Sequence, residues 1–204
     1  MKLGLVGGTF DPIHLGHVAM AEAAADCAGL DRVLLLPASI PPHKAGASAP
    51  APDRLEMSRL AVRGRPRLEV SDLELRRPGP SYTVDTLEEL AHQRSGDELY
   101  LVLGWDAARE LASWREPERV QELARLVIVT RPGWTAPTAE DLRRAGIDPA
   151  RTILCDAQTP DIEATQVREL VEAGGGLDGL LDPAVEAYIR RRRLYRVEPP
   201  SFRA

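Results

Sequence analysis

The sequence predicts an α/β fold in which helices cover both faces of a parallel β-sheet, the doubly wound arrangement. Short, nearly continuous apolar runs alternate with longer helical patterns along the 204 residues, and strands buried on both faces have this uniform apolar character. Apolar residues make up 44% of the chain, enough for one sizeable core. We therefore expect a single domain over residues 1–196, with a small helical C-terminal region at about 160–196 and a frayed tail at 197–204.

The hydrophobic pattern places the individual elements. The expected strands cover residues 3–6, 32–36, 67–71, 98–103, 126–130 and 152–155. The expected helices cover residues 16–28, 53–62, 81–93, a segment that begins at 106, 165–173 and 183–193. Asp53 is expected to cap the second helix, and the proline-rich stretch 38–52 before it is expected to be a long loop, a length that suggests function or mobility. Sheets of this kind bind ligands at the carboxyl ends of their strands.

Charge and cysteine content exclude several classes of protein. The chain carries 26 basic and 31 acidic residues, a net charge of −5, without a long block of one sign in its main body, so we expect no nucleic-acid partner. No apolar stretch reaches the ~18 residues of a membrane span, and the run 3–6 is too short for a signal sequence. Cys27 and Cys155 lack metal-type or redox spacing, so we expect buried free thiols in a cytoplasmic protein. The sequence does not determine the oligomeric state, and a homo-oligomer is one of the open alternatives.

Rare residue types mark particular places in the chain. Lys2 and Lys44 are its only lysines, and all other basic residues are arginines. A compositional bias of the genome accounts for the abundant arginine, so an arginine carries little signal by its type alone. Three of the four histidines, His14 and His17 among them, fall in the first quarter of the chain. Lys44 and this histidine pair are therefore the residues whose positions need explaining.

The turn after the first strand suits a polyphosphate. It matches neither the dinucleotide fingerprint nor a P-loop, and it reads Gly7-Gly8-Thr9-Phe10-Asp11-Pro12-Ile13-His14-Leu15-Gly16-His17. Gly7 and Gly8 let the backbone approach a ligand, and the following helix offers N–H groups and a positive dipole at its start. His14 and His17 are three residues apart, so they share one face of the first helical turn, with Gly16 keeping that face open. Two imidazoles there could stabilise charge on phosphoryl oxygens, although either one alone could be a packing or capping residue.

This turn resembles the signature of the HxGH nucleotidyltransferase superfamily, whose domain is Rossmann-like. An ordered set of later segments narrows the resemblance, over roughly residues 3–196, to the bacterial nicotinate-nucleotide adenylyltransferases. The set consists of Leu36-Pro37, Pro41-Pro42-His43-Lys44, Arg54-Leu55-x-Met57, Glu74-Leu75-x-Arg77-x-Gly79-Pro80-Ser81-Tyr82-Thr83-Val84-Asp85-Thr86-Leu87, Gly104-x-Asp106, Trp114, Arg131-Pro132-Gly133 and Thr165-x-x-Arg168. The resemblance implies transfer of AMP from ATP to nicotinate mononucleotide, giving deamido-NAD and pyrophosphate. The reaction would be an in-line attack on the α-phosphate without a covalent intermediate.

The resemblance also implies which residues contact ATP. They are Gly7, Gly8, Thr9, Phe10, His14, His17, Gly104, Asp106, Thr165 and Arg168. His14, His17 and Arg168, together with Lys44, would form the catalytic set. Thr165 and Arg168 bring a hydroxyl, a guanidinium and helix N–H groups to one side, which suits the β- and γ-phosphates. Asp106 could accept hydrogen bonds from ribose hydroxyls or simply cap a helix. No acidic cluster predicts a resident metal, so Mg²⁺ is expected to arrive with ATP.

A second set of residues is implied for nicotinate mononucleotide, namely Lys44, Tyr82, Thr83, Trp114 and Arg131. Lys44 could reach a phosphate as a point charge or be an exposed surface lysine. The helix start at Tyr82 and Thr83 offers N–H donors to the carboxylate that distinguishes nicotinate from nicotinamide, although Tyr82 could instead be an ordinary core residue. Trp114 could stack on the pyridine ring or be a core residue. Arg131 directly follows the strand 126–130, at the ligand edge of the sheet.

One position departs from the family pattern Ile-Ser-x-Thr-x-x-Arg, because this chain has Glu163 where the serine is usual. A carboxylate beside a triphosphate repels it, so the serine's role is not carried over. Glu163 could turn away and complement the helix dipole, or approach Mg²⁺.

Two other functions stay open: another HxGH adenylyltransferase, such as a pantetheine-phosphate adenylyltransferase, and a non-catalytic nucleotide sensor on the same scaffold. The sequence does not give the preference between nicotinate and nicotinamide mononucleotide.

Overall fold

Six parallel strands form one sheet in the computed structural model, which describes residues 1–40, 47–130, 135–157 and 159–196. The strands are β1 (Lys2–Gly8), β2 (Arg32–Pro37), β3 (Leu68–Val70), β4 (Glu98–Gly104), β5 (Arg125–Thr130) and β6 (Thr152–Asp156). Their spatial order is β3-β2-β1-β4-β5-β6, and each neighbouring pair is parallel. This order confirms the predicted doubly wound α/β fold. The chain first builds outward from β1 to β3 and then crosses back to β4, so the strand order reverses between β1 and β4.

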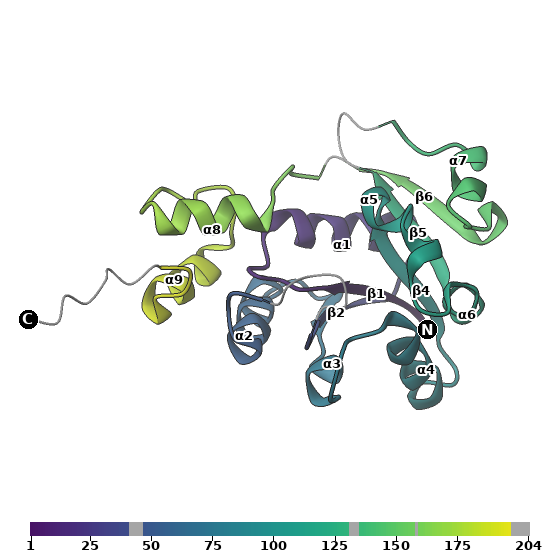
Figure 1. Cartoon of the computed structure of the whole chain (residues 1–204), viewed down its shortest axis with the longest axis horizontal. Coiled ribbons are helices and arrows are strands. Elements are labelled where there is room, and N and C mark those ends of the chain that lie inside the picture. The colour runs from purple at the N-terminus through teal and green to yellow at the C-terminus, as the bar shows by residue number, and fades with distance from the viewer. Residues whose placement is uncertain (41–46, 131–134, 158, 197–204) are drawn as a thin grey trace, which may run out of the picture.

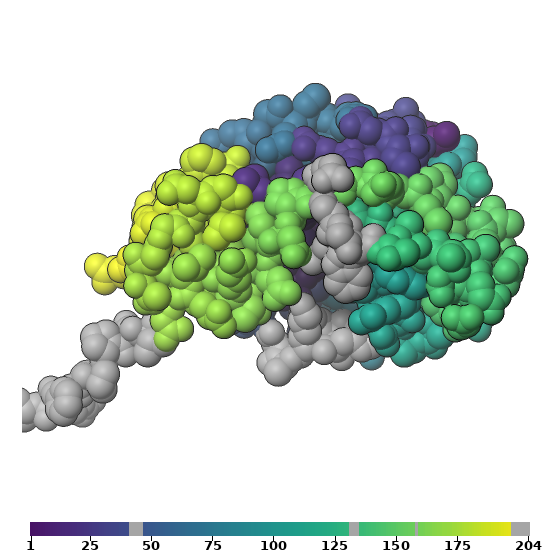
Figure 2. All heavy atoms as spheres, turned by 90° about the horizontal axis from the view of Figure 1, so that it is seen from above, coloured from purple at the N-terminus to yellow at the C-terminus, as the bar shows by residue number. Residues whose placement is uncertain are grey.

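Helices cover both faces of this sheet (Figure 1). The α-helices are α1 (Leu15–Cys27), α2 (Ala51–Ala61), α3 (Leu73–Arg76), α4 (Thr83–Gln93), α5 (Trp105–Ala108), α6 (Pro117–Leu123), α7 (Ala139–Arg144), α8 (Ala164–Glu172) and α9 (Pro183–Arg192). The two hydrophobic cores follow from strand alternation, because Leu3 and Leu5 face α3–α7, whereas Val6 faces α1, α2, α8 and α9. In Figure 2, α8 and α9 form one end of the molecule and α7 with its neighbours the other.

Asp53 is not the helix cap that the sequence suggested. α2 begins at Ala51, with Pro50 in the capping position, so Asp53 lies inside the first turn and is buried. Its carboxylate accepts hydrogen bonds from the Tyr188 hydroxyl at 2.7 Å and from Arg192 Nε at 3.1 Å. The residue therefore anchors α9 onto α2. Of the loop expected over 38–52, residues 41–46 lie outside the described part of the chain.

Several short elements differ from those expected. The helix expected from Asp106 is divided into α5 and a 3-10 turn over Leu111–Ser113. The helices α3, α6 and α7 were not expected at all, and the four residues of α3 are too few to show a helical period. Within the described residues, no helix is both long enough and apolar enough to cross a membrane.

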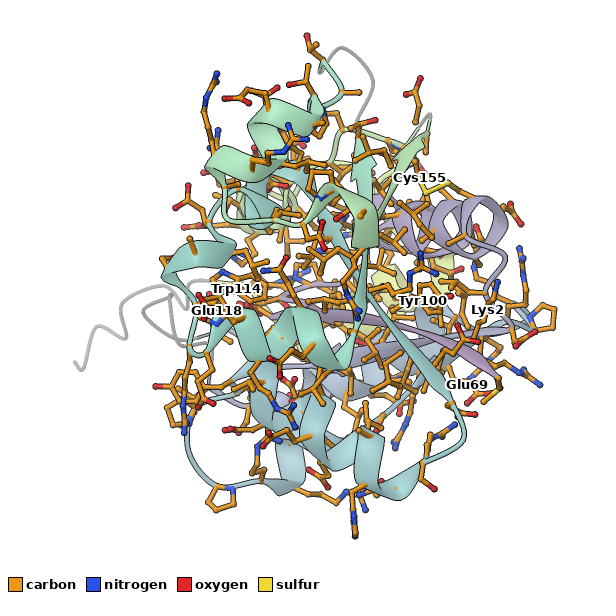
Figure 3. All side chains as sticks on the ribbon, turned by 90° about the vertical axis from the view of Figure 1, so that its right-hand side faces the viewer. Lys2, Glu69, Tyr100, Trp114, Glu118 and Cys155 are labelled. Carbon is orange, nitrogen blue, oxygen red and sulfur yellow. A yellow bond between two sulfur atoms is a disulfide. The ribbon has the colours of Figure 1, made fainter. Side chains whose placement is uncertain are left out.

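The expectation of free, buried thiols is wrong. Cys27, exposed at the end of α1, forms a disulfide with Cys155, buried in β6 (Figure 3), and their Cα atoms lie 6.0 Å apart. The two residues are 128 positions apart in the chain, so their spacing gives no sign of the pairing. They meet because α1 packs across the sheet as far as its edge strand β6.

Candidate active site

Two cavities open at the carboxyl ends of the strands. The larger, of about 540 Å³, lies on the α1 and α8 side of the sheet, and the smaller, of about 270 Å³, lies on the α4 side. Both are lined by the end of β1, at Gly7, Gly8 and Thr9, and by Leu103 and Ala107 beside β4. The two cavities therefore meet where the strand order reverses, the usual ligand position in open α/β sheets.

The larger cavity gathers every residue that the sequence predicted to contact ATP. These residues come from the end of β1, the start of α1, the end of β4 and the start of α8. Asp11, Gly16, Ser48 and Glu163 also line this cavity, although the sequence prediction did not include them among the ATP contacts. The structure thus brings the predicted set together, while the contacts of each member with ATP stay predictions.

The two glycines at the end of β1 serve different purposes. A Cβ atom at Gly7 would meet nothing within 4 Å, so its surroundings are open. A Cβ atom at Gly8 would lie 2.8 Å from a ring carbon of Phe10, which packs tightly over it. Phe10 itself is 2% exposed and has a φ of 49°, a conformation that non-glycine residues rarely adopt. Phe10 therefore lies beneath the cavity as packing, with little of its surface available to a ligand.

His14 and His17 form a stacked pair at the start of α1. His14 holds the N-cap position, and its backbone N–H donates to His17 Nδ1 at 3.3 Å. The two ring centroids lie 3.6 Å apart, and the Phe10 ring packs edge-on against His17. A Cβ atom at Gly16 would lie 3.1 Å from His14 Nδ1 and 3.0 Å from the Pro160 carbonyl oxygen. A side chain at position 16 would therefore require the His14 imidazole and the chain before α8 to move by a few tenths of an ångström.

Thr165 and Arg168 form a polar patch on the first turns of α8. Arg168 Nη2 donates to Thr165 Oγ1 at 3.0 Å, and Nη1 donates to the Asp11 carbonyl oxygen at 2.7 Å. The guanidinium is thereby tied to the glycine-rich turn, which is 157 residues away in sequence. Glu163 is the N-cap residue of α8, is exposed and makes no side-chain capping hydrogen bond. It lines the same cavity, so a carboxylate stands near the predicted phosphate position.

The smaller cavity contains three of the residues predicted for nicotinate mononucleotide, namely Tyr82, Thr83 and Trp114, the last of which is labelled in Figure 3. α4 begins at Thr83 without a side-chain cap on its first N–H groups. The Arg115 guanidinium lies 4.9 Å from the centre of the Tyr82 ring, adding positive charge to this wall. The other two predicted residues, Lys44 and Arg131, lie outside the described residues, and their roles stay predictions.

Glu74 is a buried carboxyl group in the wall of the smaller cavity, and sequence reasoning gave it no role of its own. It is 6% exposed, and its Oε1 accepts a hydrogen bond from Thr86 Oγ1 at 2.9 Å. Burial raises the pKa of Glu74, although hydrogen bonds from Thr86 and Ser81 and the charge of Arg77 act in the opposite direction. The only signal in the sequence was its place in the segment that leads into Ser81-Tyr82-Thr83.

Arg54 is a second polar residue that sequence reasoning left without a role. It is 1% exposed, and its guanidinium donates to the carbonyl oxygens of Thr9 at 2.7 Å, Ala49 at 3.2 Å and Ser39 at 3.3 Å. Burial lowers the pKa of Arg54, and the nearby Asp11 carboxylate partly offsets this. The side chain thus joins the glycine-rich turn to both ends of the segment that follows β2.

The donors around the larger cavity suit anions better than a resident metal ion. Its lining includes two imidazoles, the Thr165 hydroxyl and the Arg168 guanidinium, and also three carboxylates, those of Asp11, Asp106 and Glu163. Over the described parts of the chain, no group of three or more His, Cys, Asp and Glu side chains is placed to hold a metal ion. The arrangement can therefore bind a polyphosphate in the larger cavity and hold a second ligand against it in the smaller one.

Comparisons with known proteins agree with this arrangement. Residues 5–170 match a family model described as cytidylyltransferase-like. A Thermus thermophilus protein named "Probable nicotinate-nucleotide adenylyltransferase" is 44% identical over 196 residues, covering 96% of this chain and all of the relative. A Synechococcus protein of the same name is 41% identical, covering 95% and 94%. The structure of Plasmodium falciparum nicotinic acid mononucleotide adenylyltransferase complexed with NaAD superposes with a TM-score of 0.80, covering 95% of this chain and 97% of that one, at 17% identity.

Proposed function

The chain belongs to the nicotinate-nucleotide adenylyltransferase family, and from this we propose that it transfers AMP from ATP to nicotinate mononucleotide, forming deamido-NAD and pyrophosphate. One structural observation carries the proposal: two cavities meet at Gly7, Gly8 and Thr9, at the end of β1. A reaction that joins two nucleotides requires two adjoining sites with the reacting phosphates at their boundary. The N-terminal end of α1 lines the larger of the two cavities.

The reaction is an in-line displacement at the α-phosphorus of ATP. The attacking phosphate of the mononucleotide is already an anion, so the step requires no general base. The bond that forms joins its oxygen to the α-phosphorus, and the bond that breaks releases pyrophosphate. Catalysis then consists of positioning and charge stabilisation. His14 and His17, fixed by their mutual stacking, supply donors to the α-phosphate as its charge redistributes.

Thr165 and Arg168 hold the leaving pyrophosphate in this scheme. Both lie at the start of α8, where the helix dipole favours an anion. Mg²⁺ enters with ATP as part of that substrate and supplies charge neutralisation on its phosphate oxygens. Gly104 and Asp106, at the end of β4 and in α5, face the nucleoside part of ATP within the same cavity.

The mononucleotide occupies the smaller cavity. Its carboxylate accepts hydrogen bonds from the first N–H groups of α4, at Thr83, and its pyridine ring stacks on Trp114. Lys44 and Arg131, which lie outside the described residues, are the cations that we expect to bind its phosphate. An uncharged carboxamide at the same position would gain less from the helix dipole, so this site favours nicotinate over nicotinamide.

Pyrophosphate release tests this function directly. The protein is incubated with Mg²⁺-ATP and, in parallel, with nicotinate mononucleotide, nicotinamide mononucleotide or pantetheine phosphate. We expect the highest kcat/KM with nicotinate mononucleotide and deamido-NAD as the product identified by mass spectrometry. Turnover with pantetheine phosphate would indicate the rival adenylyltransferase. Binding of ATP without pyrophosphate release from any acceptor would indicate a nucleotide sensor.

A further inference from the structure

Asp11 receives contacts from three distant parts of the chain. It is 6% exposed, and its carboxylate accepts hydrogen bonds from the backbone N–H groups of Ser48 at 2.6 Å and Ala49 at 3.0 Å. The Tyr195 hydroxyl donates to Asp11 Oδ1 at 2.9 Å. The Asp11 backbone carbonyl accepts the hydrogen bond from Arg168 described above. One residue of the glycine-rich turn is therefore bonded to the segment before α2, to α8 and to the C-terminal segment.

Tyr195 reaches Asp11 through an unusual backbone path. α9 ends at Arg192, after which Arg193 has a φ of 55° and Tyr195 a φ of 61°. Non-glycine residues rarely adopt this conformation, and it persists where surrounding contacts hold it. Burial and the Asp11 carboxylate both raise the pKa of the Tyr195 hydroxyl. The hydroxyl consequently keeps its proton and remains a donor to Asp11 at neutral pH.

We propose that Tyr195 is a positioning residue for the ATP site, acting through Asp11 on Arg168. The hydrogen bond from Tyr195 fixes the Asp11 carboxylate, and thereby the peptide whose carbonyl oxygen orients the Arg168 guanidinium. Arg168 in turn holds Thr165, and both line the larger cavity. This inference rests on the proposed function, because it assigns Arg168 to the phosphates of ATP.

A purely structural role would be redundant with other contacts in the same region. α9 is already anchored by the hydrogen bonds of Tyr188 and Arg192 to Asp53. The Asp11 carboxylate also keeps two backbone donors when the Tyr195 hydroxyl is absent. Removing that hydroxyl should therefore leave Asp11 held from one side only, by the segment before α2, and shift its orientation without releasing the C-terminal helix.

The chain supplies a matched control for this test. Tyr195→Phe and Tyr188→Phe each remove one phenolic hydroxyl that donates to a buried aspartate, and both tyrosines lie in the same C-terminal region. Tyr195 contacts Asp11, which belongs to the glycine-rich turn, whereas Tyr188 contacts Asp53, which belongs to α2. We expect Tyr195→Phe to lower kcat/KM for ATP about 10- to 100-fold, the range for a displaced positioning contact. KM for nicotinate mononucleotide should stay within about twofold, and Tyr188→Phe should match the wild type in both quantities.

The measurement is steady-state pyrophosphate release, with each substrate varied in turn. Equal kinetics of the two variants would overturn the proposal, as would a loss in Tyr195→Phe confined to KM for the mononucleotide. The shift in thermal unfolding that Mg²⁺-ATP causes in each variant, relative to the same variant without ATP, is a second readout. It should be smaller for Tyr195→Phe than for Tyr188→Phe, even if one variant is less stable. Equal shifts would also overturn the proposal. This readout needs no turnover, so it tests the role of Tyr195 independently of catalysis. Failure of the proposed function would appear in the wild type, which would then release no pyrophosphate.

Discussion

His14 and His17 lie with their imidazole rings stacked, the centroids 3.6 Å apart and the planes 28° from parallel. The backbone N–H of His14 donates to His17 Nδ1, so Nδ1 acts as an acceptor and the proton of the neutral ring lies on Nε2. With Nδ1 as acceptor, Nε2 is the donor of the neutral ring, and the contact with the His14 backbone holds that ring in place. In the proposed reaction, the pair would act as a preorganised donor set, which costs no reorganisation when charge develops on a phosphate.

Replacing His17 with alanine should lower kcat for pyrophosphate release by about 10²- to 10³-fold, the usual effect of removing one preorganised donor. The fold should persist, because the ring is only partly buried and the neighbouring backbone bonds of α1 remain. His92→Ala, at an exposed position on α4, is the matched control and should keep full activity. Thermal unfolding monitored by circular dichroism checks the fold of both variants. A His17→Ala variant with wild-type kcat would contradict the assignment.

Glu163→Ser should keep or improve the use of ATP. The carboxylate is exposed at the N-cap of α8 and lines the cavity proposed for the phosphates, where its charge opposes theirs. A serine removes that repulsion and can cap the helix. We expect KM for ATP to be unchanged or up to about fivefold lower, the scale of one charge pair in water. Glu163→Gln separates the effect of charge from that of capping. A large loss of activity in a folded variant would show that the chain depends on this carboxylate.

The disulfide between Cys27 and Cys155 should contribute substantially to stability. It closes a loop of 128 residues, and cross-links of such loops stabilise proteins by roughly 3–5 kcal/mol. Reduction, or the Cys27→Ser substitution, should therefore lower Tm by roughly 10 °C. The Tm of Cys27→Ser should be insensitive to reductant. Peptide mapping without reductant should find the two cysteines joined, whereas alkylation of both thiols in the native, unreduced protein would contradict this pairing.

The hydrophobic pattern predicted the sheet, and the family resemblance predicted ten of the residues that line the larger cavity. Buried parallel strands have apolar runs that stand out without any knowledge of the fold. Because the doubly wound arrangement brings all strand ends to one edge, residues from distant motifs could be expected to meet there. Gly7, His17, Gly104 and Arg168 are spread over most of the chain, yet all line one cavity.

Pairs of residues joined over long distances could not be predicted in this way. Asp53 has the usual sequence features of a helix cap, and only the docking of α9 shows that it accepts a hydrogen bond from Tyr188. Asp11 and Tyr195 are 184 residues apart, and neither has a neighbour in sequence that indicates the contact. Such contacts depend on how α1, α8 and α9 pack, which local hydrophobic patterns do not specify.

Glu74 makes the stability of the protein dependent on pH in a predictable direction. Burial raises its pKa in the folded state above the ordinary value of 4.5. The folded protein therefore holds this proton more tightly than the unfolded chain does. The resulting stabilisation is complete below pH 4.5 and is lost as the pH rises through the folded-state value. At neutral pH, burial of the ionised carboxylate is a cost, which Arg77, Ser81 and Thr86 reduce.

Glu74→Gln keeps the size of this side chain and removes its titration. The difference in Tm between variant and wild type should therefore shift in favour of the variant as the pH rises from about 4.5 towards 8. Thermal unfolding at half-unit pH steps measures this difference, and Glu118→Gln, at an exposed position on α6, controls for the loss of one surface carboxylate. A difference that stays constant would show that the hydrogen bonds and Arg77 balance burial at Glu74, and a shift in favour of the wild type as the pH rises would show that they outweigh it. Either result would contradict the prediction.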